Sequence, residues 1–241
     1  MGGSSPDYQL NSGSQPIIYS QEHWNLFQYL RVQANFIVQK LASHGFHTLV
    51  YGSIARGDVS PKSDIDILIL NTLPSFQLEL ALESMDYSIE RKYLVQSTPN
   101  DNIKLVYELL GNIHIILLLS SLSTLGYDFY YFGGALTEAE LHENIRKPGV
   151  NKELFLIEPT SDGHYQSSVM DRQNEVAKIL GISDQMVKQR IRVLARRKKK
   201  GRTGVFLHQE LAIDENAEAV LHNIARSNRL VRRRLHRSKR S

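Results

Sequence analysis

Hydrophobic residues recur at every third or fourth position from residue 20 to residue 45, as expected for a helix with one buried face. Ser20 is placed to cap the start of this helix and Gly45 to end it. Farther along, apolar runs bounded by turn residues predict strands at 49–51, 64–70, 87–95, 104–109 and 113–120. A short helix is expected between the first two strands. The front half of the chain is therefore predicted to be mixed α/β.

The second half shows a different pattern, in which short helices alternate with turns. A helix is expected over 137–145 and a strand near 154–157. Helices are then predicted over 173–180 and 184–197, separated by the turn Gly181-Ile182-Ser183, which is the form of a helix-turn-helix. Residues 201–204 are expected to form the turn of a wing, and residues 205–207 its strand. A last amphipathic helix is predicted over 215–230, with the final ten residues disordered.

The composition indicates a folded protein and excludes several kinds of site. Hydrophobic residues make up 41% of the chain and charged residues 22%. The absence of cysteine excludes disulfides, zinc-thiolate sites and thiol nucleophiles, and favours a cytoplasmic setting. The longest apolar run, residues 115–119, is far shorter than the roughly 20 residues that span a bilayer, and the first residues do not resemble a signal peptide. We therefore expect no contact with a membrane.

The net charge of +4 conceals a strong asymmetry along the chain. Of the 29 Lys and Arg residues, 17 lie from Gly181 onward, together with only 5 of the 25 Asp and Glu residues. The net charge is therefore +12 in this part and −8 before it. This division predicts a polyanion ligand for the back of the chain and a separate function for the front.

Two carboxylates mark the candidate chemistry of the front half. In the strand predicted over 64–70, alternation places Asp64 and Asp66 on one face and the isoleucines between them on the other. At a separation of about 6 Å and an effective dielectric near 20, such charges repel by roughly 3 kcal/mol, and a divalent cation would reverse this. Mg²⁺ is the natural candidate because it binds carboxylates together with substrate phosphates. The alternative is a solvated pair at the start of a strand.

A small-residue turn precedes these carboxylates and changes their interpretation. Gly52-Ser53 follows the strand 49–51, where backbone amides and a hydroxyl can meet a phosphate. The run from Gly52 to Asp58, followed by Ser63-Asp64-Ile65-Asp66, resembles the signature of the DNA polymerase β-like nucleotidyltransferase superfamily. The order of the two halves is also similar to that of predicted nucleotidyltransferases of archaeal type with a C-terminal helix-turn-helix.

This resemblance implies roles for the matching residues. Gly52 and Ser53 would hold the phosphates of an NTP, and Asp64 and Asp66 would ligate two Mg²⁺ (or Mn²⁺) ions that align attack on the α-phosphate. Arg56 matches the motif as well, and either contacts phosphate or forms a salt bridge within the turn.

The sequence departs from the superfamily at the third acidic residue, which normally comes from a later strand. The strand that begins near Asn112 carries His114 where an aspartate is expected. Glu108 is the nearest acidic substitute and Glu90 a more remote one. His114 is thus a candidate catalytic residue, although a lone histidine in an apolar strand is more often structural. Loss of a general base typically costs on the order of 10² to 10⁴ in rate, so this departure bears on activity.

The second helix of the predicted helix-turn-helix carries many cations and no acid from Lys188 onward. Aromatic residues do not interleave them, which favours DNA or structured RNA over single strands. The candidate nucleic-acid-binding residues are Lys188, Arg190, Arg192, Arg196, Arg197 and Arg202.

We therefore expect four segments: a disordered lead-in (1–19), an α/β (α+β) nucleotidyltransferase domain with a mixed sheet (20–135), a connecting segment (136–168), and a small winged helix-turn-helix with a basic tail (169–241). The expected activity is Mg²⁺-dependent transfer of a nucleoside monophosphate from an NTP to a hydroxyl on nucleic acid or protein. The alternative is a nucleic-acid-binding regulator with a weak or inactive front domain. A protein acceptor or a dimer partner is compatible with both.

Overall fold

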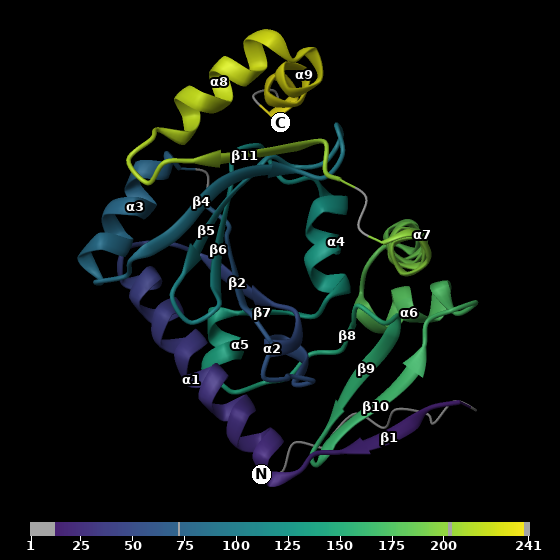
Figure 1. The fold of residues 1–241 in the computed structure, drawn as a ribbon. Helices are drawn as coiled ribbons and strands as arrows, with labels where there is room; N and C mark the ends of the chain where they lie inside the picture. The colour runs from purple at the N-terminus through teal and green to yellow at the C-terminus, as the bar shows by residue number, and fades with distance from the viewer. Residues whose placement is uncertain (1–12, 72, 202–203, 239–241) are drawn as a thin grey trace.

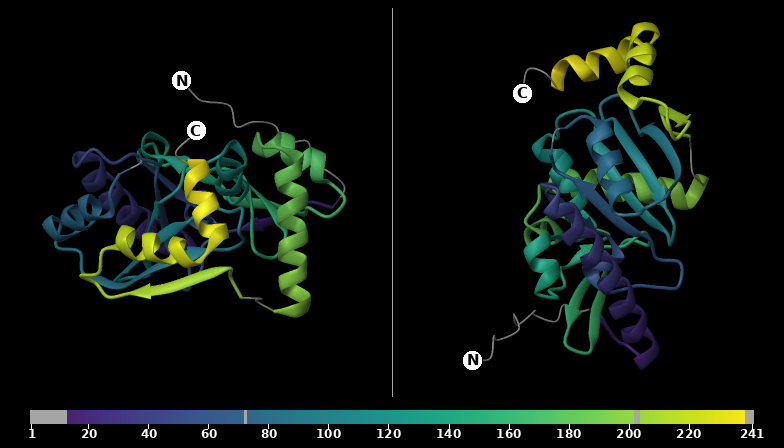
Figure 2. Two further views of the ribbon diagram at one scale, coloured as in Figure 1. Left: turned by 90° about the horizontal axis from the view of Figure 1, so that it is seen from above. Right: turned by 90° about the vertical axis from the view of Figure 1, so that its left-hand side faces the viewer.

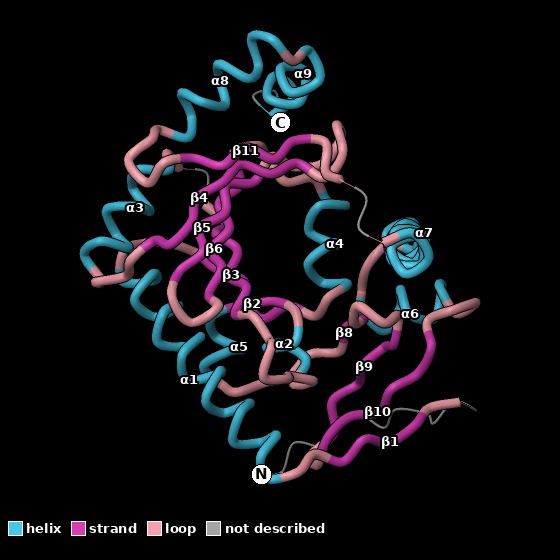
Figure 3. The backbone as a smooth tube through the Cα atoms, in the orientation of Figure 1, coloured by secondary structure: helices cyan, strands magenta, loops and turns pink. Residues whose placement is uncertain are grey.

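The computed structural model describes residues 13–71, 73–201 and 204–238. Its centre is a sheet with the strand order β11-β4-β5-β6-β3-β2-β7, in which β3 and β6 run parallel and the other neighbours antiparallel (Figures 1 and 3). The predicted mixed sheet is thereby confirmed. Its strands are β2 (Thr48–Tyr51), β3 (Ile65–Ile69), β4 (Ile89–Gln96), β5 (Lys104–Leu109), β6 (Ile113–Leu118), β7 (Ala135–Thr137) and β11 (Leu207–Leu211).

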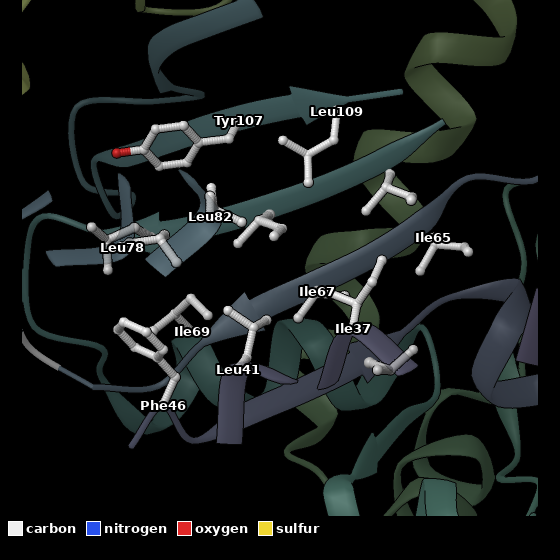
Figure 4. Packing of buried hydrophobic residues seen from close by; sticks show 14 of the residues in the cluster. Ile37, Leu41, Phe46, Ile65, Ile67, Ile69, Leu78, Leu82, Tyr107 and Leu109 are labelled. Carbon is white, nitrogen blue, oxygen red and sulfur yellow. The ribbon is translucent and has the colours of Figure 1, made fainter. Parts of the chain in front are cut away.

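Helices cover one face of this sheet and form the main core. Ile65, Ile67 and Ile69 of β3 are fully buried on this face, against α1 (Gln21–Ser43) and α3 (Ser75–Ser84). Figure 4 shows these isoleucines pointing toward Ile37 and Leu41 of α1. Two short helices, α2 (Ser53–Arg56) and α5 (Glu138–His142), add Ile54, Ala55 and Leu141 to the same core.

The opposite face of the sheet carries the functional residues and is partly covered by α4 (Thr124–Phe132) (Figure 1). Tyr130 of this helix packs with Leu68 and Ile116 of the sheet. The alternation of β3 therefore separates the core from the site, because residues between the buried isoleucines face α4 instead.

A second, four-stranded antiparallel sheet adjoins α4 and runs in the order β1-β10-β9-β8. Its strands are β1 (Gln15–Ile18), β8 (Gly149–Val150), β9 (Phe155–Thr160) and β10 (Gly163–Ser168). The expectation of a disordered lead-in over 1–19 is wrong for β1, while residues 1–12 lie outside the described ranges. The Ile17 carbonyl approaches Gly163 so closely that a Cβ there would lie 1.9 Å from its oxygen. This pairing depends on tertiary contact, which the local composition does not reveal.

The predicted pair of helices is present as α6 (Gln173–Leu180) and α7 (Asp184–Lys200). Gly181 ends α6 in the left-handed conformation, and the Ser183 hydroxyl accepts a hydrogen bond from the Met186 amide at the start of α7. Val187 of α7 packs against Phe132 of α4 and Leu156 of β9. The helices therefore share a core with the second sheet.

Of the wing strand expected over 205–207, only Leu207 lies in a strand, and that strand belongs to the central sheet. β11 pairs antiparallel with β4, and the chain continues into α8 (Ala217–Ser227) and α9 (Arg229–Ser238), which lie outside the sheet at its β11 end (Figure 2). Leu221 and Val231 are buried in the main core. The expected boundary at residue 169 and the disordered final ten residues are therefore wrong up to Ser238.

Buried polar contacts hold this C-terminal segment in place. Lys92 of β4 is 1% exposed, and its Nζ donates to the Glu215 carbonyl at 2.8 Å and to Glu79 of α3 at 3.2 Å. The Glu218 carboxylate accepts hydrogen bonds from the amide and hydroxyl of Ser75, at 2.6 and 2.7 Å. Among the helices within the described ranges, none is long and apolar enough to cross a membrane.

Candidate functional site

The turn between β2 and α2 lies next to β3. Gly52 has a φ of 86°, a conformation that favours glycine, and a Cβ built there would lie 3.8 Å from Asp66 Oδ2. Its amide donates to the Gly134 carbonyl at 2.9 Å, which fixes the turn. The Ser53 hydroxyl donates to the Ser63 hydroxyl at 3.1 Å. The Gly-Ser turn and the segment before Asp64 are thus joined directly.

Asp64 and Asp66 lie at the start of β3, where β2 ends beside it. Tyr51 pairs with Asp66 in the antiparallel register. Ile65 is fully buried, whereas the Asp66 side chain is 29% exposed and Asp64 is half-buried. The predicted alternation is therefore observed.

His114 lies beside Asp66, at the position that the sequence indicated for a third acidic residue. The parallel register pairs the two residues, and His114 Nδ1 lies 3.1 Å from Asp66 Oδ1. This hydrogen bond raises the pKa of His114 above its usual 6.5, while partial burial opposes the shift. With Nδ1 occupied by Asp66, Nε2 is the ring atom left to exchange a proton with a substrate.

Glu108 continues this row of polar residues across the sheet. It pairs with His114 in the register of β5 and β6, and it accepts hydrogen bonds from Tyr93 at 3.0 Å and Arg91 at 3.1 Å. Burial and the bond to Glu108 raise the pKa of Tyr93 to about 12. Glu108 is therefore adjacent to His114 but already engaged by two donors.

Of the two roles predicted for Arg56, the structure contains the salt bridge. Its guanidinium pairs with Asp58 at 2.9 Å and also donates to the Gly133 carbonyl. The side chain is 8% exposed. We therefore correct its assignment as a phosphate ligand, because Arg56 is buried and supports the turn that carries Ser53.

The carboxylate pair fits a divalent cation that shares its ligands with a substrate. Carboxylate oxygens are hard donors of the kind that Mg²⁺ prefers. Within the described ranges, no three His, Asp or Glu side chains converge to hold a metal by themselves. A cation at Asp64 and Asp66 would accordingly need phosphate oxygens or water as its remaining ligands.

Two tyrosines that the sequence analysis missed line the same side of the sheet. The rings of Tyr51 and Tyr130 meet edge to face with centroids 4.9 Å apart. Burial raises the pKa of both hydroxyls, and the charge of Asp66 raises them further. Tyr51 precedes the Gly-Ser turn directly, which is a local signal, whereas Tyr130 reaches the site only through the packing of α4.

The candidate nucleic-acid ligands of α7 fall into two groups. Arg192, Arg196 and Arg197 are exposed, and so is Lys188, which pairs with Asp184 at 2.6 Å. Arg190 is instead half-buried, with its guanidinium 4.7 Å from the centroid of the Phe129 ring. Its assignment to an outward reading surface is therefore wrong, and Arg202 lies outside the described residues.

Comparison with known proteins identifies a family for the segment that contains this site. Residues 35–117 match the model of the nucleotidyltransferase domain. The matched segment runs from α1 to β6 and includes the Gly-Ser turn, both aspartates and His114. No curated protein matches the chain.

Proposed function

Because residues 35–117 form a nucleotidyltransferase domain of the DNA polymerase β-like superfamily, we propose that the chain transfers a nucleoside monophosphate from an NTP to a hydroxyl on nucleic acid or protein. Asp64 and Asp66 would hold Mg²⁺ or Mn²⁺, and Gly52 and Ser53 would bind the nucleotide phosphates. The bound cations would offset the negative charge that phosphates and carboxylates bring together.

The observation that carries this proposal is the proximity of the Gly-Ser turn to Asp66. A Cβ built on Gly52 would lie 3.8 Å from Asp66 Oδ2, which is ordinary van der Waals contact. Ser53 is hydrogen-bonded to Ser63, the residue before Asp64. A phosphate at the turn amides would therefore lie beside the carboxylates. This juxtaposition is what transfer at an α-phosphate requires, since the same cations must contact the carboxylates and the phosphate.

His114 is the proposed acceptor of the proton released by the attacking hydroxyl. Its hydrogen bond to Asp66 orients the ring and leaves Nε2 available, which is the arrangement of an oriented general base. A side chain that is 27% exposed can be reached by a substrate. Asp66 would then stabilise the charged ring after the proton has transferred.

The test is to replace both aspartates and to measure the effect of metal on nucleotide binding. In the wild-type chain, Mg²⁺ should strengthen NTP binding in calorimetry, and Asp64→Asn with Asp66→Asn should abolish that effect without unfolding the protein. Asp171→Asn with Asp214→Asn removes two exposed acids elsewhere and serves as the matched control. A double variant at the site that keeps its metal-dependent affinity would exclude the carboxylate site.

The acceptor can be identified by incubating the chain with each labelled NTP, Mg²⁺ and either cellular RNA or protein lysate. Label on RNA or on a protein band, absent from the Asp64→Asn/Asp66→Asn variant, would identify the class of acceptor.

The second candidate is a nucleic-acid-binding regulator whose front domain binds nucleotide without transfer. The observation that favours it is His114 in place of a carboxylate, together with the exposed cations Arg192, Arg196 and Arg197 on α7. Metal-dependent NTP binding without labelled product, combined with tight binding to duplex DNA or structured RNA, would support this candidate over the enzyme.

A further inference from the structure

Two cations from distant parts of the chain meet on one aromatic ring of α4. Lys104 of β5 places Nζ 4.7 Å from the centroid of the Phe129 ring and 5.1 Å from that of Tyr130. The Arg190 guanidinium of α7 lies 4.7 Å from the same Phe129 centroid. Their like charges repel, and the charge of Arg190 accordingly lowers the pKa of Lys104.

Neither cation has an anionic partner in the part of the chain that the structure describes. No ion pair or hydrogen bond to a carboxylate involves Lys104 or Arg190 there, and Arg190 Nε is buried without a partner. The Tyr130 hydroxyl is likewise buried and unpartnered. Asp101 raises the pKa of both cations through its charge, yet it forms an ion pair with neither.

This pair of cations lies on the same face of the sheet as the carboxylates. Lys104 contacts the ring of Tyr130, which in turn packs edge to face on Tyr51, the register partner of Asp66. Burial lowers the pKa of Lys104 to about 8, whereas the charge of Asp66 acts in the opposite direction. Two aromatic rings therefore separate the cations from the candidate catalytic carboxylates.

We propose that Lys104 and Arg190 bind a phosphate group of the substrate whose reacting end lies at Asp64 and Asp66. This inference rests on the nucleotidyl transfer proposed above and deepens it. A phosphate would relieve the repulsion between the cations and supply acceptors for Arg190, whose planar donors suit phosphate oxygens. The helix-turn-helix would thereby contribute a residue to the substrate site of the front domain.

The phosphate has two possible sources, which binding measurements separate. It belongs either to the NTP or to a nucleic-acid acceptor, so the probes are ATP with Mg²⁺ in calorimetry and a fluorescent RNA oligonucleotide in anisotropy at low salt. The test variant is Lys104→Met with Arg190→Met, which keeps long apolar side chains on Phe129. The matched control is Lys40→Met with Lys152→Met, because Lys40 Nζ also lies over a ring, 5.2 Å from the Phe36 centroid, and Lys152 is exposed and lies outside both candidate sites.

We expect the test variant to lose about 10- to 100-fold in affinity for one of the two probes, the range expected for charged hydrogen bonds. A loss for ATP alone assigns the phosphate to the nucleotide, and a loss for RNA alone assigns it to the acceptor. The control variant should stay within about twofold of wild type, as surface charges contribute little. Unchanged affinity for both probes in the folded test variant would overturn the inference.

A measurement on the wild-type chain covers the case in which the test variant does not fold. Lys104 should be acetylated more slowly by an amine-reactive reagent when ATP with Mg²⁺ or the RNA is bound, which mass spectrometry measures. Absence of protection by both would also overturn the inference. Asp64→Asn with Asp66→Asn should abolish transfer yet retain protection by the RNA, or by ATP at a concentration that still saturates the variant, so the proposed function can fail while the phosphate site stands.

Discussion

At the scale of single residues, His114 determines what kind of site the sheet carries. It lies between Asp66 and Glu108 in the strand register, hydrogen-bonded to the first and adjacent to the second. The resemblance to the superfamily indicated this position, because an acidic residue is expected on the strand that carries His114. The sequence could not indicate that Glu108 is held by Arg91 and Tyr93, since those contacts cross strands.

Replacement of His114 should separate its two interpretations. His114→Asp restores the acidic residue expected of the superfamily and should raise any transfer rate, whereas a structural histidine predicts that His114→Ala leaves the rate low and unchanged. Steady-state transfer of labelled NTP measures both variants, with melting temperature as the control for folding. The role as base proposed above predicts a loss of about 10² or more in the folded His114→Ala variant.

At the scale of elements, the sequence predicted those features that depend on contacts between residues close together in the chain. The caps of α1 and α7, the Gly-Ser turn and the alternation of β3 were all visible in the sequence, and each was observed. Strand β11 was not predicted over its length, and Leu207 was assigned to a wing, because the partner strand β4 lies more than a hundred residues earlier in the chain. β1 was not predicted because its partner, β10, is also distant in the sequence. α4 was not predicted because its sequence combines aromatic residues with a glycine.

A contact between Tyr19, which follows β1, and His164 of β10 makes stability depend on pH. The Tyr19 hydroxyl and His164 Nδ1 are 2.7 Å apart, and His164 is 6% exposed. Burial lowers the pKa of His164, and the charges of His23 and Arg146 lower it further, whereas the charge of Asp58 raises it. The unfolded chain therefore takes up a proton first as pH falls below about 6.5, and the folded state loses stability below that pH.

His164→Gln should remove this part of the pH dependence. The free energy of unfolding of the wild type should fall below pH 6.5 by up to about 1.4 kcal/mol per pH unit more than that of the variant. Denaturant titrations between pH 5 and 8 measure the difference, with Tyr19→Phe as a control that retains His164. Parallel pH profiles for wild type and His164→Gln would contradict the assignment.

At the scale of the whole molecule, the charge asymmetry of the sequence is distributed over two separate helical surfaces. The exposed arginines of α7 form one, and those of α8 and α9 form the other, at the β11 end of the sheet. Composition indicated the excess of positive charge, but only the fold shows that it does not belong to one compact reading domain.

Salt dependence should reveal which surface binds nucleic acid. If roughly 6 phosphates are contacted, the logarithm of the affinity for duplex DNA should fall with the logarithm of salt concentration at a slope of about −5. Arg192→Gln, Arg196→Gln and Arg197→Gln together should make that slope shallower by about 3, because each displaced counterion contributes about 0.9. The same number of changes at Arg226, Arg229 and Arg233 tests the other surface, and an affinity insensitive to salt would contradict nucleic-acid binding.

The pairing of β11 with β4 has a consequence for how the protein is made. When translation has passed Leu118, the strands β2 to β6 have been synthesised, but the outer edge of β4 has no partner and Lys92 lacks the carbonyl of Glu215. An unpaired edge can join another chain, and nascent domains are exposed to this during synthesis. The nucleotidyltransferase sheet is therefore completed only when the ribosome has added the segment that follows α7.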